Sequence, residues 1–307
     1  MHVDGFHFLA SILSRDHEGP PMASPPILWD IESDPILANV KLIAEAWDAA
    51  GLYQVGSFVG DSWKEWNGRF RDDVRAFLKA GTGTVRSLPL GCRGARTSTQ
   101  REEREAEQSI NFVTCHDGFT LNDLVSFNGK HNEANGEGNR DGADQNLSWN
   151  CGIEGPTADL EVERLRNRQV KNFLTLTLLA TGTPMLLMGD EVRRTQGGNN
   201  NADCQNTEIS WFDWTLVEKH ADIHRFFKAL VALRMNRDLP IERLDMTLNE
   251  LLRRPPIQWR GVKLNVSDWG DQSHTLAATV PLLGYQLQLH LVINAYWGRS
   301  SSKSPLS

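Results

Sequence analysis

Carboxylic acids stand at the ends of several apolar runs in this sequence. When two carboxylates lie close together, they can perform general acid–base or nucleophilic chemistry. Glu45 follows one run, Asp117 with His116 follows a second, and Asp190 with Glu191 follows a third. An acid after a strand is also a common N-cap of the next helix, so each position alone keeps two interpretations. Together these acids predict a carboxylate-lined site.

Alternating strand and helix patterns lead to these acids. The predicted strands are the apolar runs, whose continuity is typical of a parallel sheet that is buried on both faces. Apolar residues at three- and four-residue steps predict the intervening helices. The strands are 2–8, 40–48, 110–118 and 184–191, and the helices are 62–81 and 161–180. This alternation predicts a (β/α) architecture with its chemistry at the carboxyl edge of the sheet.

The pattern changes after Trp214. One more amphipathic helix is predicted at 217–238, and short alternating stretches at 257–264, 274–280 and 285–297 predict antiparallel strands. We expect three parts: a (β/α) part over 1–238, a small β domain over 239–297 and a tail over 298–307. The charged stretch 88–108 predicts an exposed loop.

Composition narrows the classes of partner and the compartment. The net charge of −7 over 307 residues argues against a nucleic acid or an anionic membrane as partner. The four cysteines form no C-x-x-C pair, which predicts free thiols in a reducing cytoplasm. No signal-peptide pattern opens the chain, and the longest apolar stretch, 173–188, is broken by Gly182 and Pro184, so no membrane span is predicted. The ten tryptophans suit sugar stacking and core packing equally.

The stretch 130–155 is rich in Asn, Gly and Asp. It does not meet the D-x-[DN]-x-[DN]-G spacing of a calcium loop. Turn chemistry is therefore the better interpretation, and no metal site is predicted.

The motifs VDGFHF-LAS, KLIAEAWD, INFVTCHDGFTLNDLVS, NEANGEGNRDG, SWNCGIEG and GTPMLLMGDE occur in this order. In spelling and order they resemble the retaining α-glucan hydrolases of the α-amylase superfamily (glycoside hydrolase family 13), and among these the isoamylase-type glycogen debranching enzymes. The resemblance implies a partial TIM (β/α)8 barrel, about strands 4–8 of an N-terminally truncated member, followed by a small antiparallel β domain. It also implies cleavage of α-1,6 branch linkages in glycogen, amylopectin or limit dextrin, without a metal or organic cofactor.

The resemblance also implies roles for the acids. Glu45 matches the acid/base and Asp117 the transition-state stabiliser, while His116 matches a histidine that contacts sugar hydroxyls. A retaining mechanism needs one carboxylic acid to protonate the glycosidic oxygen and a second carboxylate to attack the anomeric carbon. The further residues expected to bind substrate are His7, Trp47, Asp190 and Glu191.

The attacking carboxylate is missing from the first motif. The family spells it G-F-R-F-D-L-A-S, but here His7 replaces the Arg, the Asp is deleted and Leu9 lies near its place. Leucine cannot form a glycosyl ester. Asp4 lies five positions before Leu9, about 16 Å along an extended strand, too far to substitute.

Three hypotheses follow. The chain is a debranching-hydrolase homologue that is inactive alone, because its nucleophile and the first half of the barrel are absent. Alternatively, it is a non-catalytic glucan-binding or regulatory subunit of a debranching complex, with an oligomer or a partner subunit that completes the barrel. The third hypothesis is an unstable truncated fragment.

Overall fold

The computed structural model describes residues 3–9, 13–15, 19, 22, 24–48, 51–58, 60, 62–88, 108–237, 258–263, 266–281 and 288–296. The chain divides into two compact units. The first is drawn from Met1–Asp72, Pro89–Val113 and Ala180–Leu186, and the second from Asp73–Leu88, Thr114–Leu179 and Leu187–Ser307.

The first unit contains a five-stranded parallel sheet. Each strand pairs in parallel with the next strand along the chain. The strands are β1 (Gly5–Phe8), β2 (Lys41–Ala44), β3 (Trp63–Asn67), β4 (Ser109–Asn111) and β5 (Thr183–Pro184). Sequential parallel order is the winding of a (β/α)8 barrel, because a doubly wound sheet reverses its strand order. The predicted fold class, about five strands of such a barrel, is confirmed.

The prediction of one helix over 62–81 is wrong in its first turn. Residues Trp63–Asn67 form β3, and helix α3 is Gly68–Leu78. Trp66 stands four residues before Phe70 and so continued the helical spacing, although it belongs to the strand. The side-chain oxygen of Asn67 accepts from the N–H of Phe70 at 2.9 Å, which stabilises the start of the helix.

The strands predicted at 110–118 and 184–191 are much shorter than expected. β4 ends at Asn111, whose carbonyl accepts from the N–H of Met185 at 2.8 Å. Gly189, with φ of 100°, then precedes the 3₁₀ turn η3 (Asp190–Val192). Asp190 therefore lies in a turn and not at the end of a strand.

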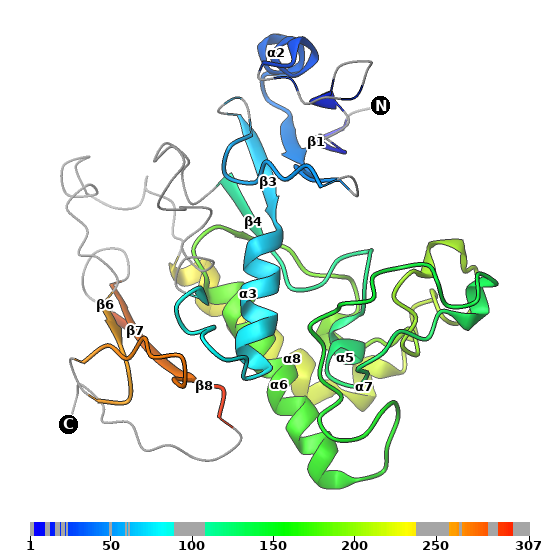
Figure 1. Cartoon of the computed structure of the whole chain (residues 1–307), viewed down its shortest axis with the longest axis vertical. Helices are drawn as coiled ribbons and strands as arrows, with labels where there is room; N and C mark the ends of the chain where they lie inside the picture. Colours follow the sequence, from blue (N-terminus) through cyan, green and yellow to red (C-terminus); the bar gives the residue numbers. More distant parts are fainter. Residues whose placement is uncertain are drawn as a thin grey trace. The chain divides into compact units, whose positions relative to one another are not determined.

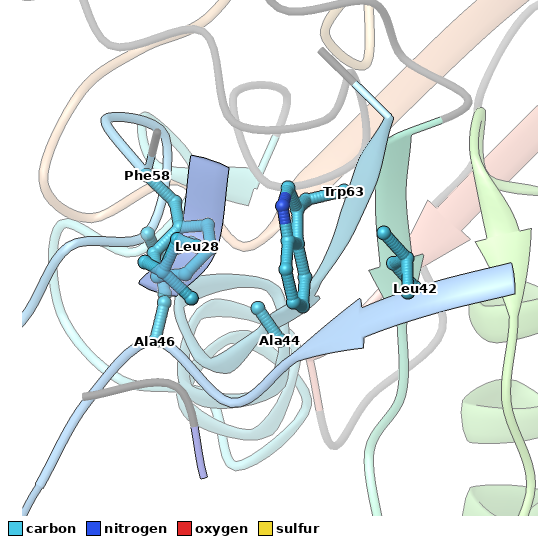
Figure 2. Close-up of a cluster of buried hydrophobic side chains, with 7 residues drawn as sticks. Leu28, Leu42, Ala44, Ala46, Phe58 and Trp63 are labelled. Atoms are coloured by element: carbon cyan, nitrogen blue, oxygen red, sulfur yellow. The ribbon is translucent and has the colours of Figure 1, made fainter. Parts of the chain in front are cut away.

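A hydrophobic cluster supports the carboxyl end of β2 (Figure 2). Trp63 is fully buried and packs edge-on against Phe58, with ring centroids 5.5 Å apart. Helix α2 (Pro26–Ser33), which has proline at its start, contributes Leu28 to the cluster. Ala44 and Ala46, on either side of Glu45, are buried in the same cluster, so this core fixes the backbone that carries the acid.

Helices and turns make up much of the second unit. Helix α6 (Leu160–Leu179) confirms the helix predicted at 161–180, and Asp159 caps it by accepting from the N–H groups of Glu161 and Val162 at 2.9 and 3.1 Å. The other elements are α5 (Leu121–Leu124), η2 (Glu133–Asn135), η4 (Ala202–Cys204), α7 (Leu216–Lys219) and α8 (Ala221–Arg237). None of the described helices has the length and apolar character needed to cross a membrane.

A three-stranded antiparallel sheet follows, as predicted. It consists of β6 (Gln258–Arg260), β7 (Thr275–Pro281) and β8 (Gln288–Asn294), shown in orange to red in Figure 1. The predicted domain boundary at 238/239, the loop core at 89–107 and the tail at 298–307 lie outside the described residues. The division at 238 therefore stays a prediction.

Candidate functional site

In the first unit, the ends of β1 and β2 bring His7 and Glu45 together. The parallel register pairs Phe8 with Ala44, and the N–H of Glu45 donates to the carbonyl of Phe8 at 2.9 Å. His7 Nε2 then lies 3.8 Å from Glu45 Oε2, within ion-pair distance when the imidazole is protonated. The side chain of Glu45 is only 14% exposed and that of His7 33%, so a small surface of the acid faces solvent.

Aromatic rings surround this acid. The imidazole of His7 stacks on Trp66 with centroids 4.2 Å apart, and Trp47 lies parallel to Tyr53 at 6.2 Å. We call His7, Trp47, Tyr53 and Trp66 the aromatic platform, in which Trp66 is buried and the other three rings are partly exposed. Burial raises the pKa of the Tyr53 hydroxyl, and the guanidinium of Arg69 lies 5.3 Å from the centre of that ring. Flat rings beside a carboxylic acid suit the apolar face of a sugar.

Trp47 and His7 of this platform were predicted from the sequence as site residues, whereas Tyr53 and Trp66 were not. Trp66 was assigned to a helix, which hid its place on β3 beside His7. Tyr53 forms an isolated β-bridge with Trp47, and a bridge between two loop residues has no periodic signal.

Leu9 follows β1 directly and is 57% exposed, at the position where the family motif predicts the attacking carboxylate. Asp4 precedes β1, at the opposite end of the strand from Leu9. Asp48 accepts from the guanidinium of Arg15 at 2.9 and 2.5 Å. The buried carboxylate of Glu65 accepts from the N–H of Gly56 at 2.6 Å. Asp4 is therefore at the wrong end of the strand to replace the missing carboxylate, and Asp48 and Glu65 are engaged in other contacts.

In the second unit, His116 and Asp117 form an exposed pair. His116 Nε2 lies 3.5 Å from Asp117 Oδ1, and the two side chains are 63% and 69% exposed. Gly118 follows with φ of 105°, and its N–H donates to the carbonyl of Asn200 at 2.9 Å. This pair is available to a ligand that binds from solvent.

The structure places Asp190 in the interior of the same unit. Its carboxylate accepts from Thr114 Oγ1 and, at 2.9 Å, from the N–H of Leu121. Burial raises the pKa of Asp190 to about 7 against the opposing effect of these hydrogen bonds. Thr114 and Leu121 stand on either side of His116–Asp117, so the described contacts of Asp190 brace that turn. Its predicted contact with substrate would require it to leave these donors, and that role stays a prediction.

Two further carboxylates hold neighbouring turns. Glu191, half-buried, accepts from the N–H of Gly189 at 2.9 Å. Asp123 is fully buried and accepts from the N–H groups of Gln196 and Gly198 at 2.7 and 3.3 Å. Burial raises the pKa of Asp123. Residues 114–127 are therefore fastened to residues 189–198 by buried acids.

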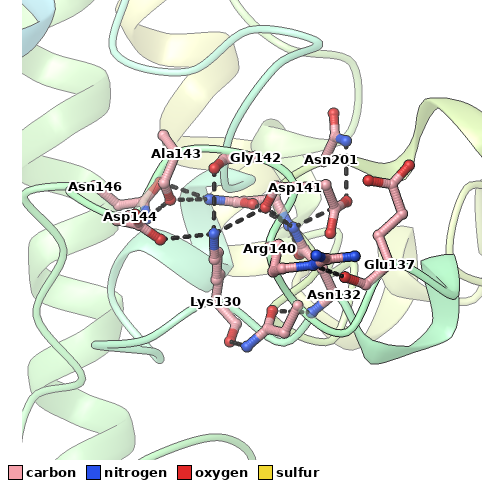
Figure 3. A network of polar contacts seen from close by, with 12 residues as sticks. Lys130, Asn132, Glu137, Arg140, Asp141, Gly142, Ala143, Asp144, Asn146 and Asn201 are labelled. Carbon is pink, nitrogen blue, oxygen red and sulfur yellow. Dashed lines mark hydrogen bonds and ion pairs between the residues drawn. The ribbon is translucent and has the colours of Figure 1, made fainter.

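A network of amide side chains joins the Asn-rich stretch 130–155 to the residues that follow 189–198, Asn200 above all (Figure 3). Asn132 and Asn200 are buried, and their side chains are linked by a bond of 2.8 Å from Asn132 Nδ2 to Asn200 Oδ1. Asn132 Oδ1 also accepts from the N–H of Asn200 at 2.9 Å. The ammonium of Lys130 donates to the carbonyl of Asp141 at 2.9 Å and pairs with Asp144 at 2.6 Å. This loop is organised by turns and amide bonds, and it fixes the carbonyl of Asn200 that holds Gly118.

The predicted site residues thus fall into two groups. His7, Leu9, Glu45 and Trp47 belong to the first unit, and His116, Asp117, Asp190 and Glu191 to the second. Each group contains an acid beside a histidine: the largely shielded Glu45 lies beside His7, and the exposed Asp117 lies beside His116.

Several curated proteins are similar in sequence to this chain. A "Glycogen operon protein GlgX homolog" of Mycobacterium tuberculosis is 50% identical over 240 residues, which cover 77% of this chain and 33% of the relative. "Isoamylase SU1, chloroplastic" of Zea mays is 42% identical over 302 residues, covering 91% of this chain and 38% of the relative. The sequence of this chain is therefore similar to those of the isoamylase-type debranching enzymes.

A "Glycogen debranching enzyme" of Erwinia tasmaniensis is also 41% identical over 280 residues and covers 90% of this chain. This chain spans 33% to 41% of the length of these three debranching-family relatives. No protein-family model matches the chain.

Solved structures of pullulanases share the fold. The type I pullulanase of Bacillus subtilis, complexed with maltose, superposes with a TM-score of 0.63 at 19% identity and covers 95% of this chain and 37% of its own. The pullulanase of Paenibacillus barengoltzii, in complex with maltohexaose and α-cyclodextrin, gives 0.57 at 21% identity and covers 86% of this chain and 38% of its own. These likenesses support the partial barrel followed by a small antiparallel sheet.

Proposed function

We propose that this chain is a glucan-binding segment of an α-1,6-glucan debranching hydrolase, with Glu45 as the acid/base residue. In this proposal Asp117 and His116 contact sugar hydroxyls, and the aromatic platform stacks on the glucan. The similarity to isoamylases and to a glycogen debranching enzyme supports the substrate class, which is branched α-glucan. The shielded carboxyl of Glu45 beside His7 supports the role of proton donor.

The chemistry requires two carboxyl groups with different tasks. A retaining hydrolase protonates the glycosidic oxygen with one and forms a glycosyl ester with the other, about 5–5.5 Å away. Glu45 has the limited exposure and the aromatic neighbours that suit the first task. When its imidazole is protonated, His7 can stabilise the ionised form of Glu45 after proton transfer, since Nε2 is 3.8 Å from the carboxylate.

We further propose that this chain has negligible turnover. The observation that carries this proposal is Leu9 at the end of β1, where an attacking carboxylate is expected. Leucine offers no oxygen to the anomeric carbon. A proton donor without an attacking group leaves the glucan bound but uncleaved.

A non-catalytic glucan-binding subunit is the second candidate function. The aromatic platform favours it, because stacking surfaces bind sugars whether or not the bond is cleaved. The two candidates make the same prediction for binding and differ only in whether a partner restores turnover.

Purified chain incubated with amylopectin limit dextrin tests both proposals. We expect glucan retention in affinity electrophoresis and no release of reducing ends above the buffer control. Glu45→Gln should leave retention largely intact, and Glu208→Gln, an exposed acid of the second unit, is the matched control. Reducing ends released at an enzymatic rate and lost in Glu45→Gln alone would refute inactivity. A folded chain, judged by circular dichroism, that is not retained by glucan would refute both functions.

A further inference from the structure

The second unit contains a cavity that no step above uses. Its volume is about 320 Å³, near the lower limit of small-ligand pockets. Its walls come from four places: the residues directly after α3, the loop before α6, α6 itself and the residues after β8. The residues that matter are Lys79, Trp149, Leu165, Arg168, Gln169 and Tyr296.

Two cations at this cavity have no counter-charge among the described residues. Lys79 and Arg168 are exposed, and within the described part of the chain neither side chain makes an ion pair or a hydrogen bond. The same helix neutralises its other arginines, since Arg164 pairs with Glu161 and Arg166 with Glu163. Among the described residues, no carboxylate lines the cavity. In a chain with a net charge of −7, this arrangement is suited to an anion.

The other walls suit a sugar ring. Two aromatic residues, Trp149 and Tyr296, line the cavity, and the ring of Tyr296 packs edge-on against His274 at 4.9 Å. Its hydroxyl donates to the carbonyl of Gln272 at 2.7 Å, which holds the ring in place. Gln169 is buried, and its Oε1 accepts from Asn172 at 3.0 Å. Among the described residues nothing accepts from Gln169 Nε2, which leaves that donor for a ligand oxygen.

We propose that this cavity binds a phosphorylated sugar. The phosphate is neutralised by Lys79 and Arg168, and the sugar ring lies among Trp149, Tyr296 and Gln169. A neutral sugar would use the aromatic rings but would leave both cations without a partner. The small volume favours one monosaccharide phosphate over a nucleotide, which needs room for a base as well. The proposal does not depend on the activity proposed for Glu45.

Isothermal titration calorimetry on the full chain tests the ligand class. The probes are glucose 1-phosphate, glucose, inorganic phosphate and AMP, at low ionic strength. We expect glucose 1-phosphate to bind at least about tenfold more tightly than glucose or inorganic phosphate, because only it uses both the cations and the rings. Equal affinity for glucose, tighter binding of AMP, or no binding of glucose 1-phosphate would each overturn the proposal.

Charge-matched variants test the site. Arg168→Gln and Lys79→Gln should each weaken glucose 1-phosphate binding by about tenfold, the size of one charge-assisted contact. Arg164→Gln removes the same charge from α6 but does not line the cavity, and it should change the affinity by less than about twofold. All three side chains are exposed, so circular dichroism should show folded protein. Equal effects of Arg164→Gln and Arg168→Gln would assign the binding to general charge and overturn the site.

The phosphate ester has two sources, a free hexose phosphate or a phosphoryl group on a glucan chain. Maltotriose that carries one phosphate, compared with glucose 1-phosphate, distinguishes them. Tighter binding of the phosphorylated maltotriose supports the glucan source, and binding of glucose 1-phosphate alone supports the free metabolite. Binding of neither, or loss of neither in Arg168→Gln, overturns the proposal.

Discussion

At the scale of single residues, the buried carboxyl of Asp190 makes stability depend on pH. Its ordinary pKa is 3.8, and burial raises the pKa to about 7 in the folded chain. Below 3.8 both the folded and the unfolded chain hold the proton, so Asp190 has no effect. Between 3.8 and about 7 the unfolded chain releases the proton first, and the free energy of unfolding falls as the pH rises. The full loss is about 4 kcal/mol, reached above about pH 7.

Asp190→Asn should remove this dependence, because an amide can still accept from Leu121 and can donate to Thr114. Urea unfolding gives the free energy of unfolding of Asp190→Asn and of the unsubstituted chain. From about pH 4 to pH 8 the value of the variant should rise relative to that of the unsubstituted chain, by up to about 4 kcal/mol. Asp203→Asn, at an exposed position, is the control and should follow the unsubstituted chain. Parallel pH profiles for Asp190→Asn and the unsubstituted chain would show that Asp190 is ionised throughout.

Trp47 is the residue on which glucan stacking should depend most. It follows Glu45 by two positions and lies parallel to Tyr53. Trp47→Ala should weaken the binding of a linear maltooligosaccharide by about tenfold, which is about 1.4 kcal/mol. Trp214→Ala removes an indole that is 77% exposed in the second unit and should have little effect. Calorimetry on both variants measures the affinity for the maltooligosaccharide, after thermal unfolding confirms that Trp47→Ala is folded. Equal affinities of the two variants would show that Trp47 does not stack on the glucan.

At the scale of elements, glycines decide whether the Asn-rich loop can close on the 189–200 segment. Gly142 has φ of 69°, and a Cβ there would lie 2.9 Å from Asn132 Nδ2 and against the amide of Asn200. Gly136, in the same loop, has φ of 78° with open space around it. Gly136→Ala should therefore lower the free energy of unfolding by about 1 kcal/mol, which is the cost of left-handed backbone strain alone. Gly142→Ala should lower the free energy of unfolding by about 2 kcal/mol more, because the hydrogen-bonded pair Asn132–Asn200 must separate to make room for the added Cβ.

Urea unfolding of the two alanine variants at one pH gives this difference directly. Because both positions have left-handed backbone, the comparison isolates the packing against the amide pair. Equal losses would mean that the pair yields without cost and does not fix the loop.

The sequence predicted elements whose signal is local and failed where tertiary contacts decide. Helix α6 and strand β7 have clear periodicity and were predicted to within about one residue of their bounds, whereas β6 and β8 are shorter than the stretches predicted for them. β3 was missed because Trp66 fits the helical spacing of the residues after it. Glu45 and Asp117 could be proposed as site residues from their motifs. The burial of Asp190 could not, because it depends on Thr114 and Leu121, far away in the sequence.

At the scale of the whole molecule, charge separates the two proposed ligands. A glucan is neutral and is held by rings and hydrogen bonds, so the net charge of −7 neither attracts nor repels it. A sugar phosphate approaches against that net charge and depends on Lys79 and Arg168. Raising NaCl from about 50 mM to about 500 mM shortens the Debye length from about 14 Å to about 4 Å and screens this exposed pair of cations.

Glucan affinity should therefore change by less than about twofold over this range of salt, whereas glucose 1-phosphate affinity should fall several-fold. Calorimetry at the two salt concentrations measures both ligands on one preparation. In Lys79→Gln the salt dependence of glucose 1-phosphate binding should become shallower, because one of the two screened charges is gone, while the glucan result stays the same. If glucan affinity fell as steeply as that of the phosphate, both ligands would be held by charge, and the aromatic platform would not be the glucan site.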